Sequence, residues 1–191
     1  MPRQSDSRDR MIAAAARLLR RQGYEATGWR QVVAEGHAPW GSQSHHFPGG
    51  KEQLAAEALA REGERVRSEL ATALADAHPA DMVRRWADFA ARVLEESDWS
   101  EGCPIATTAL ETAHASDALA RACNAAFESW RHEFDAAIRR RGVKRAEATR
   151  LATLVVASTE GALLLARTGR DAAPLHSVAR ELSAILRERV P

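Results

Sequence analysis

Residues Thr27–Leu54 read TGWRQVVAEGHAPWGSQSHHFPGGKEQL, and this stretch decides the fold. The apolar residues within 29–33 recur at the spacing of one face of a short helix. A turn follows over 36–39, and Trp40–His46 is expected to form a second short helix. That helix ends before Pro48, because a proline disfavours helical geometry at the residue preceding it. Two short helices joined by a tight turn predict a helix-turn-helix unit.

Helices are also expected on both sides of this unit. Ser7–Gln22 carries apolar residues on one face, and Gly23 is suited to end that helix because glycine accepts the left-handed cap conformation. No strand pattern of comparable length is present. The chain is therefore predicted to be all-α with about nine helices, divided into a three-helix head over 1–50 and a larger helical body over 51–191. The longer helices expected in the body cover about 50–76, 80–96, 105–114, 117–141, 144–168 and 174–190.

The charge of the chain is unevenly distributed between head and body. Residues 1–51 contain eight Lys and Arg against four Asp and Glu, a net charge of +4, whereas the remaining residues contain nineteen against twenty-two, a net charge of −3. A basic head on a slightly acidic body suits contact with phosphate groups at one end of the protein.

The composition excludes several classes of protein and site. The longest apolar runs, 152–158 and 161–166, are too short to span a bilayer, and the N-terminus lacks the apolar core of a signal peptide, so a cytoplasmic location is predicted. Cys103 and Cys123 are interpreted as small buried apolar residues, without disulfide or zinc-site spacing. The pair His45–His46 cannot easily share a metal ion, because adjacent helical side chains point about 100° apart. No metal or other cofactor is expected.

Two motifs in the sequence resemble a known family of regulators. The segment from Gly23 to Thr27, followed at the usual interval by HHFPGGKEQL at 45–54, resembles the DNA-binding region of the TetR/AcrR family. The segment GCPIATTALE at 102–111 resembles the LmrA/YxaF-like branch of that family. The resemblance implies a ligand-responsive transcriptional regulator, usually a repressor, that binds double-stranded operator DNA as a homodimer. It also implies release by a small hydrophobic or aromatic effector, with 1–50 as the DNA-binding domain and 51–191 as the ligand-binding and dimerisation domain.

The resemblance, together with side-chain chemistry, indicates which residues contact DNA. A recognition helix lies in the major groove and presents its N-terminal residues to base edges, and here that helix would be Trp40–His46. Thr27, which stands where the N-cap of the first short helix is expected, would contact phosphate along with Arg30 and Lys51. The expected DNA-binding residues are Thr27, Arg30, Trp40, Gly41, Ser42, Gln43, Ser44, His45, His46 and Lys51.

Four positions in this region depart from the pattern of the family, and one of them is Trp40, where arginine or another polar residue is common. Glycine is usual at the position of His37, and a hydrophobic residue and a tyrosine are common at the positions of Gln43 and Ser44. These departures leave open an altered operator preference or weaker DNA binding.

Two further sets of residues are predicted in the body. Apolar and aromatic side chains with few polar anchors suit an effector cavity, although the same aromatic stripes would also serve as core. The expected pocket residues are Trp86, Phe89, Val93, Thr107, Glu111, Phe127, Trp130 and Phe134. Small and apolar residues on the last two long helices suit close packing against a second copy of the chain. The expected dimer-interface residues are Leu154, Ser158, Gly161, Leu165, Leu182 and Ile185.

Two other functions compete with gene regulation. An enzyme would have to assemble Cys103, Glu111, His114 and Ser158, and no nucleophile elbow, metal motif or phosphate loop supports it, so the chain is not expected to be an enzyme. The other candidate is a helical ligand-binding or interaction protein whose head binds DNA weakly or not at all. A DNA shift assay at two salt concentrations distinguishes that protein from a repressor.

Overall fold

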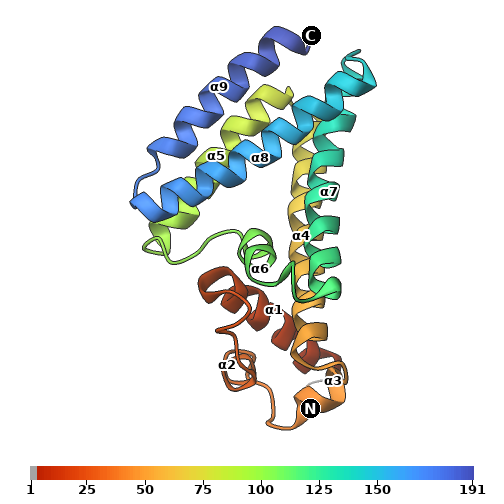
Figure 1. Ribbon diagram of the computed structural model, residues 1–191, viewed down its shortest axis with the longest axis vertical. Coiled ribbons are helices and arrows are strands. Elements are labelled where there is room, and N and C mark those ends of the chain that lie inside the picture. The colour runs from red at the N-terminus through yellow and green to blue at the C-terminus, as the bar shows by residue number, and fades with distance from the viewer. Residues whose placement is uncertain (1–3) are drawn as a thin grey trace. The chain divides into compact units, whose positions relative to one another are not determined.

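Figure 1 shows the computed structural model of the chain, which describes residues 4–191, with side chains described from Ser7 onward. Within these residues the chain forms nine helices and no strand, so the all-α prediction is confirmed. The helices are α1 (Gln4–Gln22), α2 (Trp29–Glu35), α3 (Ser42–His46), α4 (Gly50–Asp76), α5 (Pro79–Glu96), α6 (Pro104–Thr112), α7 (Asp117–Arg140), α8 (Arg145–Gly169) and α9 (Ala173–Arg189).

The two short helices begin later than the sequence predicted. The N-cap of α2 is Gly28, so the prediction that Thr27 caps this helix is wrong. Thr27 is buried, and its hydroxyl donates a hydrogen bond of 2.6 Å back to the carbonyl of Gly23, which turns the side chain away from α2. Helix α3 begins at Ser42 rather than at Trp40, because Gly41 immediately before it adopts a left-handed φ of 96°.

The helices divide into two compact units. Unit 1 comprises the chain up to Gly63 together with Cys103–Ala126, and unit 2 comprises Glu64–Gly102 together with Phe127–Pro191. Helices α4 and α7 therefore each contribute their first half to unit 1 and their second half to unit 2. Helix α6 belongs to unit 1 with the head, whereas the sequence placed it in the body. The functional division into 1–50 and 51–191 stays a prediction.

Unit 1 is built around α1, which packs against both α2 and α6. The apolar face of α1 is buried through Met11, Leu18 and Leu19, and the side chains that cover it include Val32 and Ile105. An ion pair of 2.5 Å between Arg20 of α1 and Glu62 of α4 lies beside this core, with both side chains largely buried. The head is therefore held by α4 and α6 as well as by its own three helices.

Unit 2 contains a layer of three helices in which α5 and α8 both pack against α9 and also contact each other (Figure 1). The apolar faces of these helices alternate with exposed charged residues, as expected for amphipathic helices on a core. An aromatic cluster joins α5 to α7, with the ring of Trp86 stacked 6.0 Å from Phe134 and in edge contact 6.2 Å from Trp130. Both α7 residues are fully buried, so the cluster is part of the core.

Helix α8 is long and apolar enough to cross a membrane by length and composition alone. A buried helix of a globular protein meets the same test, and the face of α8 that includes Leu151, Val155 and Ala162 is indeed buried within unit 2. The opposite face exposes Leu154, Leu164 and Leu165.

Candidate nucleic-acid interface and effector domain

The turn between α2 and α3 is shaped by two adjacent residues of unit 1. Gly36 lies close to the backbone of both neighbouring helices. An added Cβ would be 3.3 Å from backbone atoms of Met11 in α1 and 2.9 Å from the carbonyl oxygen of Val32 in α2. His37 takes a left-handed φ of 46°, a conformation that favours glycine. The guanidinium of Arg10 donates hydrogen bonds to both carbonyl oxygens of this turn, at 2.8 Å and 3.2 Å. The left-handed backbone explains why the family pattern has glycine at His37.

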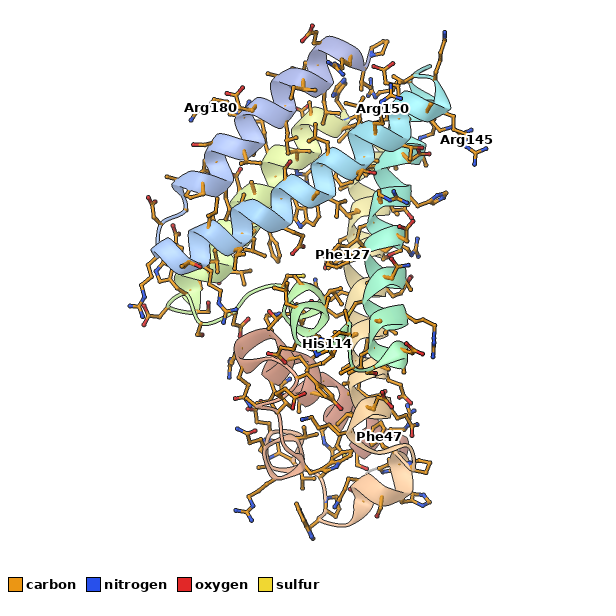
Figure 2. The ribbon with its side chains drawn as sticks, viewed as in Figure 1. Phe47, His114, Phe127, Arg145, Arg150 and Arg180 are labelled. Carbon is orange, nitrogen blue, oxygen red and sulfur yellow. The ribbon has the colours of Figure 1, made fainter. Side chains whose placement is uncertain are left out.

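Helix α3 is supported from beneath by the first two helices. Phe47, the residue after α3, is almost completely buried, and its ring lies 6.0 Å from the ring of Trp29 in α2 (Figure 2). The guanidinium of Arg8 lies 5.3 Å from the centre of the same phenyl ring. Nε2 of His46 lies 2.7 Å from the hydroxyl of Ser7, a second link from α3 to α1. These contacts hold α3 in one orientation, as a recognition helix requires.

The pKa of His46 is lowered by its position at this support. Partial burial of the ring is the largest cause, and the neighbouring His45 and the cationic Arg8 act in the same direction. His46 is therefore a poorer cation than an ordinary surface histidine, and the neutral ring can take part in the hydrogen bond with Ser7 as donor or acceptor.

The outer side of the head presents exposed side chains of the predicted DNA-binding set. The indole of Trp40 is 68% exposed, in the turn immediately before α3. Arg30 on α2 and Ser44 and His45 on α3 are also exposed. One guanidinium, one large aromatic ring and two hydrogen-bonding groups suit contacts to phosphates and to the edges of bases.

The side chains of Ser42, Gln43 and Ser44 each form a hydrogen bond with the local backbone, so the exposed hydroxyl of Ser44 is already used as a donor. The side-chain oxygen of Gln43 accepts a hydrogen bond of 2.7 Å from the N–H of Gly41, while the hydroxyls of Ser42 and Ser44 donate to the carbonyls of Pro39 and Gly41. Gln43 thus closes the start of the helix and does not extend its apolar side. The sequence pattern could not distinguish this local role from a base contact.

The two other predicted phosphate contacts are placed differently from each other. Thr27 is buried, its hydroxyl donates to the carbonyl of Gly23 and its backbone N–H donates to the carbonyl of Tyr24 at 3.1 Å, so both donors are engaged within the head and its contact with phosphate stays a prediction. Lys51 lies at the start of α4, with its ammonium 4.1 Å from the centre of the Tyr24 ring and 3.3 Å from the carbonyl oxygen of Glu25. This ammonium is held at the turn between α1 and α2, where it adds positive charge.

The turn between α1 and α2 is fixed by a residue that the sequence assigned elsewhere. One carboxylate oxygen of Glu111, on α6, accepts hydrogen bonds from the backbone N–H groups of Tyr24 and Glu25 at 2.6 Å and 3.0 Å. Gly23 suits this position because its φ of 77° is left-handed, and an added Cβ would also displace the Glu111 carboxylate. Glu111 is therefore already engaged by the head, and its expected role as an effector anchor stays a prediction. The 86 or 87 residues that separate it from its partners left no local signal for this contact.

Comparisons with known proteins agree with this geometry. Residues 11–58 match the family described as bacterial regulatory proteins, tetR family, and residues 79–181 match the C-terminal domain of LmrA/YxaF-like transcriptional regulators. The chain is 36% identical over 171 residues to the HTH-type transcriptional regulator LmrA of Bacillus subtilis, covering 89% of this chain and 91% of that protein. The chain belongs to the TetR family of transcriptional regulators.

Two further relatives extend the match of this TetR-family regulator to its whole length. It is 33% identical to the HTH-type transcriptional regulator YxaF of Bacillus subtilis, with 99% of this chain and 100% of the relative covered. A crystal structure of a TetR transcriptional regulator from Chloroflexus aurantiacus J-10-FL has a TM-score of 0.80 and 31% identity, and covers 100% of this chain and 98% of that one. Both Bacillus subtilis relatives carry the description of HTH-type transcriptional regulators. In the TetR-family regulator itself, His114 is an exposed residue in the turn after α6 (Figure 2).

The predicted effector residues of the TetR-family regulator fall in different units. Thr107 and Glu111 belong to unit 1, and the hydroxyl of Thr107 donates to the carbonyl of Cys103. The other six belong to unit 2, where Trp130 and Phe134 are buried core, Trp86, Val93 and Phe127 are half-buried, and Phe89 is 44% exposed. The ring of Phe127, labelled in Figure 2, makes an edge contact of 5.5 Å with Trp130. The structure brings together the aromatic members within unit 2.

The predicted dimer residues also differ in exposure. Leu154, Gly161 and Leu165 lie on the exposed face of α8, and Ser158 is half-buried beside them. On α9, Ile185 is half-buried, whereas Leu182 is buried inside unit 2 by its own chain. Leu164 is 57% exposed on the same face of α8 and was missed, although its spacing from Gly161 and Leu154 was available in the sequence.

Unit 2 also contains charged residues that the sequence reasoning did not single out. Arg85 and Arg92 lie on α5, four residues before and three residues after Phe89, and all three line one cleft between α5 and α4. The signal that could have identified them is their helical spacing around an exposed aromatic residue.

Proposed function

We propose that this TetR-family regulator is a repressor that binds double-stranded operator DNA as a homodimer in the cytoplasm and releases it when a small hydrophobic or aromatic effector binds. The observation that carries the proposal is the set of exposed side chains on and next to the two short helices of the head, namely Arg30, Trp40 and His45. The buried Phe47, directly after α3, anchors that helix in the head. The net charge of +4 on residues 1–51 favours approach to a phosphate backbone.

A shift assay with the DNA upstream of the regulator's own gene tests DNA binding directly. A specific complex that weakens steeply between about 50 and 200 mM salt supports the proposal, because phosphate contacts release counterions. Arg30→Gln should weaken binding to all sequences and reduce the salt slope by about one, whereas Trp40→Ala should weaken the specific complex more than the non-specific one. Arg121→Gln is the matched control, because it removes one exposed arginine of unit 1 that lies on α7. Absence of any complex, with and without candidate effectors, would favour a ligand-binding protein that has lost DNA binding.

The exposed face of α8 supports assembly as a homodimer. Leu154, Leu164 and Leu165 give it an apolar surface, and Gly161 among them permits close helix packing. A second copy covering this face also accounts for an apolar helix without placing it in a membrane. A dimer suits the function, because helix-turn-helix proteins read paired half-sites.

Sedimentation of a charge variant tests the dimer. Leu165→Glu would bury a carboxylate on each side of a two-fold contact and should convert the dimer to monomer. Ser68→Glu places the same charge at an exposed position of α4 and should leave the assembly unchanged. A wild-type protein that sediments as a monomer at micromolar concentration would refute this part of the proposal.

Release of DNA is proposed to follow from a shift between two arrangements of the protein. An effector can only favour the arrangement that it binds more tightly. Helices α4 and α7 each contribute to both compact units, so they are the continuous helices through which such a shift would act. A small-molecule panel that includes aromatic compounds, scored by loss of the DNA complex, would identify the effector.

A further inference from the structure

Unit 2 contains a cleft of about 470 Å³ between the second half of α4 and the facing side of α5. Its lining includes Leu70 of α4 and Met82, Trp86 and Phe89 of α5, which together give it an apolar floor. The volume lies within the range of small-molecule sites, about 300–1,000 Å³. Phe89 is 44% exposed, so one aromatic side chain of this floor remains accessible.

Two arginines of α5 stand on either side of this aromatic residue. Arg85, Phe89 and Arg92 are spaced four and three residues apart, so the three side chains share one face of the helix. Both guanidinium groups are exposed, and no described residue forms a hydrogen bond or ion pair with either. A guanidinium carries about five N–H donors, so the two arginines together offer about ten donors that no described residue uses.

Two acidic residues line the same cleft, and each lies close to a basic side chain outside it. Glu69 of α4 forms an ion pair of 2.6 Å with Arg65, one turn earlier on the same helix. Asp88 of α5 lies 3.5 Å from the ring of His176 on α9, an ion pair whenever that histidine is protonated. Glu69 is matched by Arg65, so Asp88 leaves one carboxylate in the lining against the two guanidinium groups of Arg85 and Arg92, and the charge in excess is positive.

We propose that this cleft binds an aromatic organic anion, such as an aryl carboxylate or sulfonate. Arg85 and Arg92 would hold the anionic group by charge-assisted hydrogen bonds, and the aromatic body would lie on Phe89 and Trp86. The ring of Trp86 is stacked 6.0 Å from that of the buried Phe134, which keeps the indole in place for such a contact. The inference gives the effector a chemical class, and only its regulatory meaning rests on the proposed function.

A pair of fluorescent probes tests the inference without DNA. Anilinonaphthalene sulfonate carries an aromatic body and one anionic group, while N-phenylnaphthylamine has a closely similar body and no charge. Each probe is titrated into the full-length wild-type protein, the double variant Arg85→Gln/Arg92→Gln, the conservative double variant Arg85→Lys/Arg92→Lys, and Arg84→Gln. Arg84 is the control, because it is an exposed arginine of α5 that does not line this cleft.

The anionic probe should bind about tenfold more weakly to the glutamine variant, as expected for loss of charge-assisted contacts at a partly exposed site. The lysine variant and Arg84→Gln should retain wild-type affinity, and the neutral probe should bind all four proteins equally. Equal binding of the anionic probe to wild type and the glutamine variant would overturn the inference, and so would an equal loss in Arg84→Gln. If the glutamine variant lost binding of both probes, the lysine variant would decide. Retained binding of the anionic probe to the lysine variant would support the inference, and its loss would overturn the inference. A failure to bind operator DNA would refute the repressor and leave these titrations unaffected.

Discussion

Replacement of Glu111 by alanine should destabilise the head of the regulator. The carboxylate accepts two backbone hydrogen bonds, from Tyr24 at 2.6 Å and from Glu25 at 3.0 Å. Hydrogen bonds to a charged group contribute about 1.5–3 kcal/mol each when buried. The Glu25 amide is exposed and water replaces part of its bond, so we expect a loss of about 2 kcal/mol in the free energy of unfolding for the pair. Glu111→Gln keeps an oxygen acceptor without the charge and should lose about half as much.

Two measurements check the Glu111 prediction. Urea unfolding followed by tryptophan fluorescence reports the free energy, and hydrogen exchange reports the local opening of the Tyr24 and Glu25 amides, which should exchange about tenfold faster or more in the alanine variant. Leu110→Ala is the control, because that side chain is 77% exposed on the same helix. The reasoning would be refuted if Glu111→Ala kept the wild-type unfolding free energy within about 0.5 kcal/mol and the two amides exchanged at unchanged rates. A residue acting only as an effector anchor would give that negative result and alter effector affinity instead.

Three further predictions concern the turn, a histidine and the two thiols. Gly36→Ala should lower the free energy of unfolding by about 2 kcal/mol, because its Cβ would meet the backbone of Met11 and Val32. His37→Gly should raise it by about 0.5 kcal/mol, because glycine relieves the left-handed φ. Urea unfolding at neutral pH measures both variants, and a Gly36→Ala protein of wild-type stability would contradict the close approach. The pKa of His46 is lowered in the folded protein, so the unfolded chain binds this proton more readily. The contribution of His46 to stability is fully present above the unfolded pKa, near 6.5, and is lost as the pH falls through the folded pKa. A plot of unfolding free energy against pH across this window should be flatter for His46→Gln than for wild type, and unchanged for the exposed His114→Gln. Burial raises the pKa of the Cys123 thiol to about 11, so iodoacetamide at about pH 8 should modify the half-buried Cys103 first. Mass spectrometry measures the order of labelling, and modification of Cys123 before Cys103 would contradict the burial of Cys123.

The helices were predictable from the sequence because their signals are local. Periodic apolar residues, Gly23 and Pro48 located most of the helices to within a few residues. The exceptions were set by backbone geometry: Gly41 is left-handed and delays α3, and the side chain of Thr27 is bonded backwards to the head and cannot cap α2. Residue type alone does not distinguish these conformations.

The candidate sites were less predictable, because they depend on distant contacts. The aromatic stripes that contain Trp86 and Phe134 were each expected to be core or pocket. In the structure Trp130 and Phe134 of α7 are buried in the core, while Phe89 of α5 is exposed. The engagement of Glu111 by the head depends on how α6 packs against α1, which no local pattern encodes. The significance of Arg85 and Arg92 depends on which acids already have partners, and only the folded chain supplies that information.

The composition of unit 1 has a consequence for protein engineering. A chimeric regulator made by grafting residues 1–50 onto a foreign sensor would leave behind α6, which packs on α1, and the half of α4 that carries the Glu62 partner of Arg20. A transplant that respects the fold would carry two separate pieces of chain, up to Gly63 and Cys103–Ala126. It would need three joins, two of them inside α4 and α7 with the helical phase preserved and the third between Gly102 and Cys103, before α6.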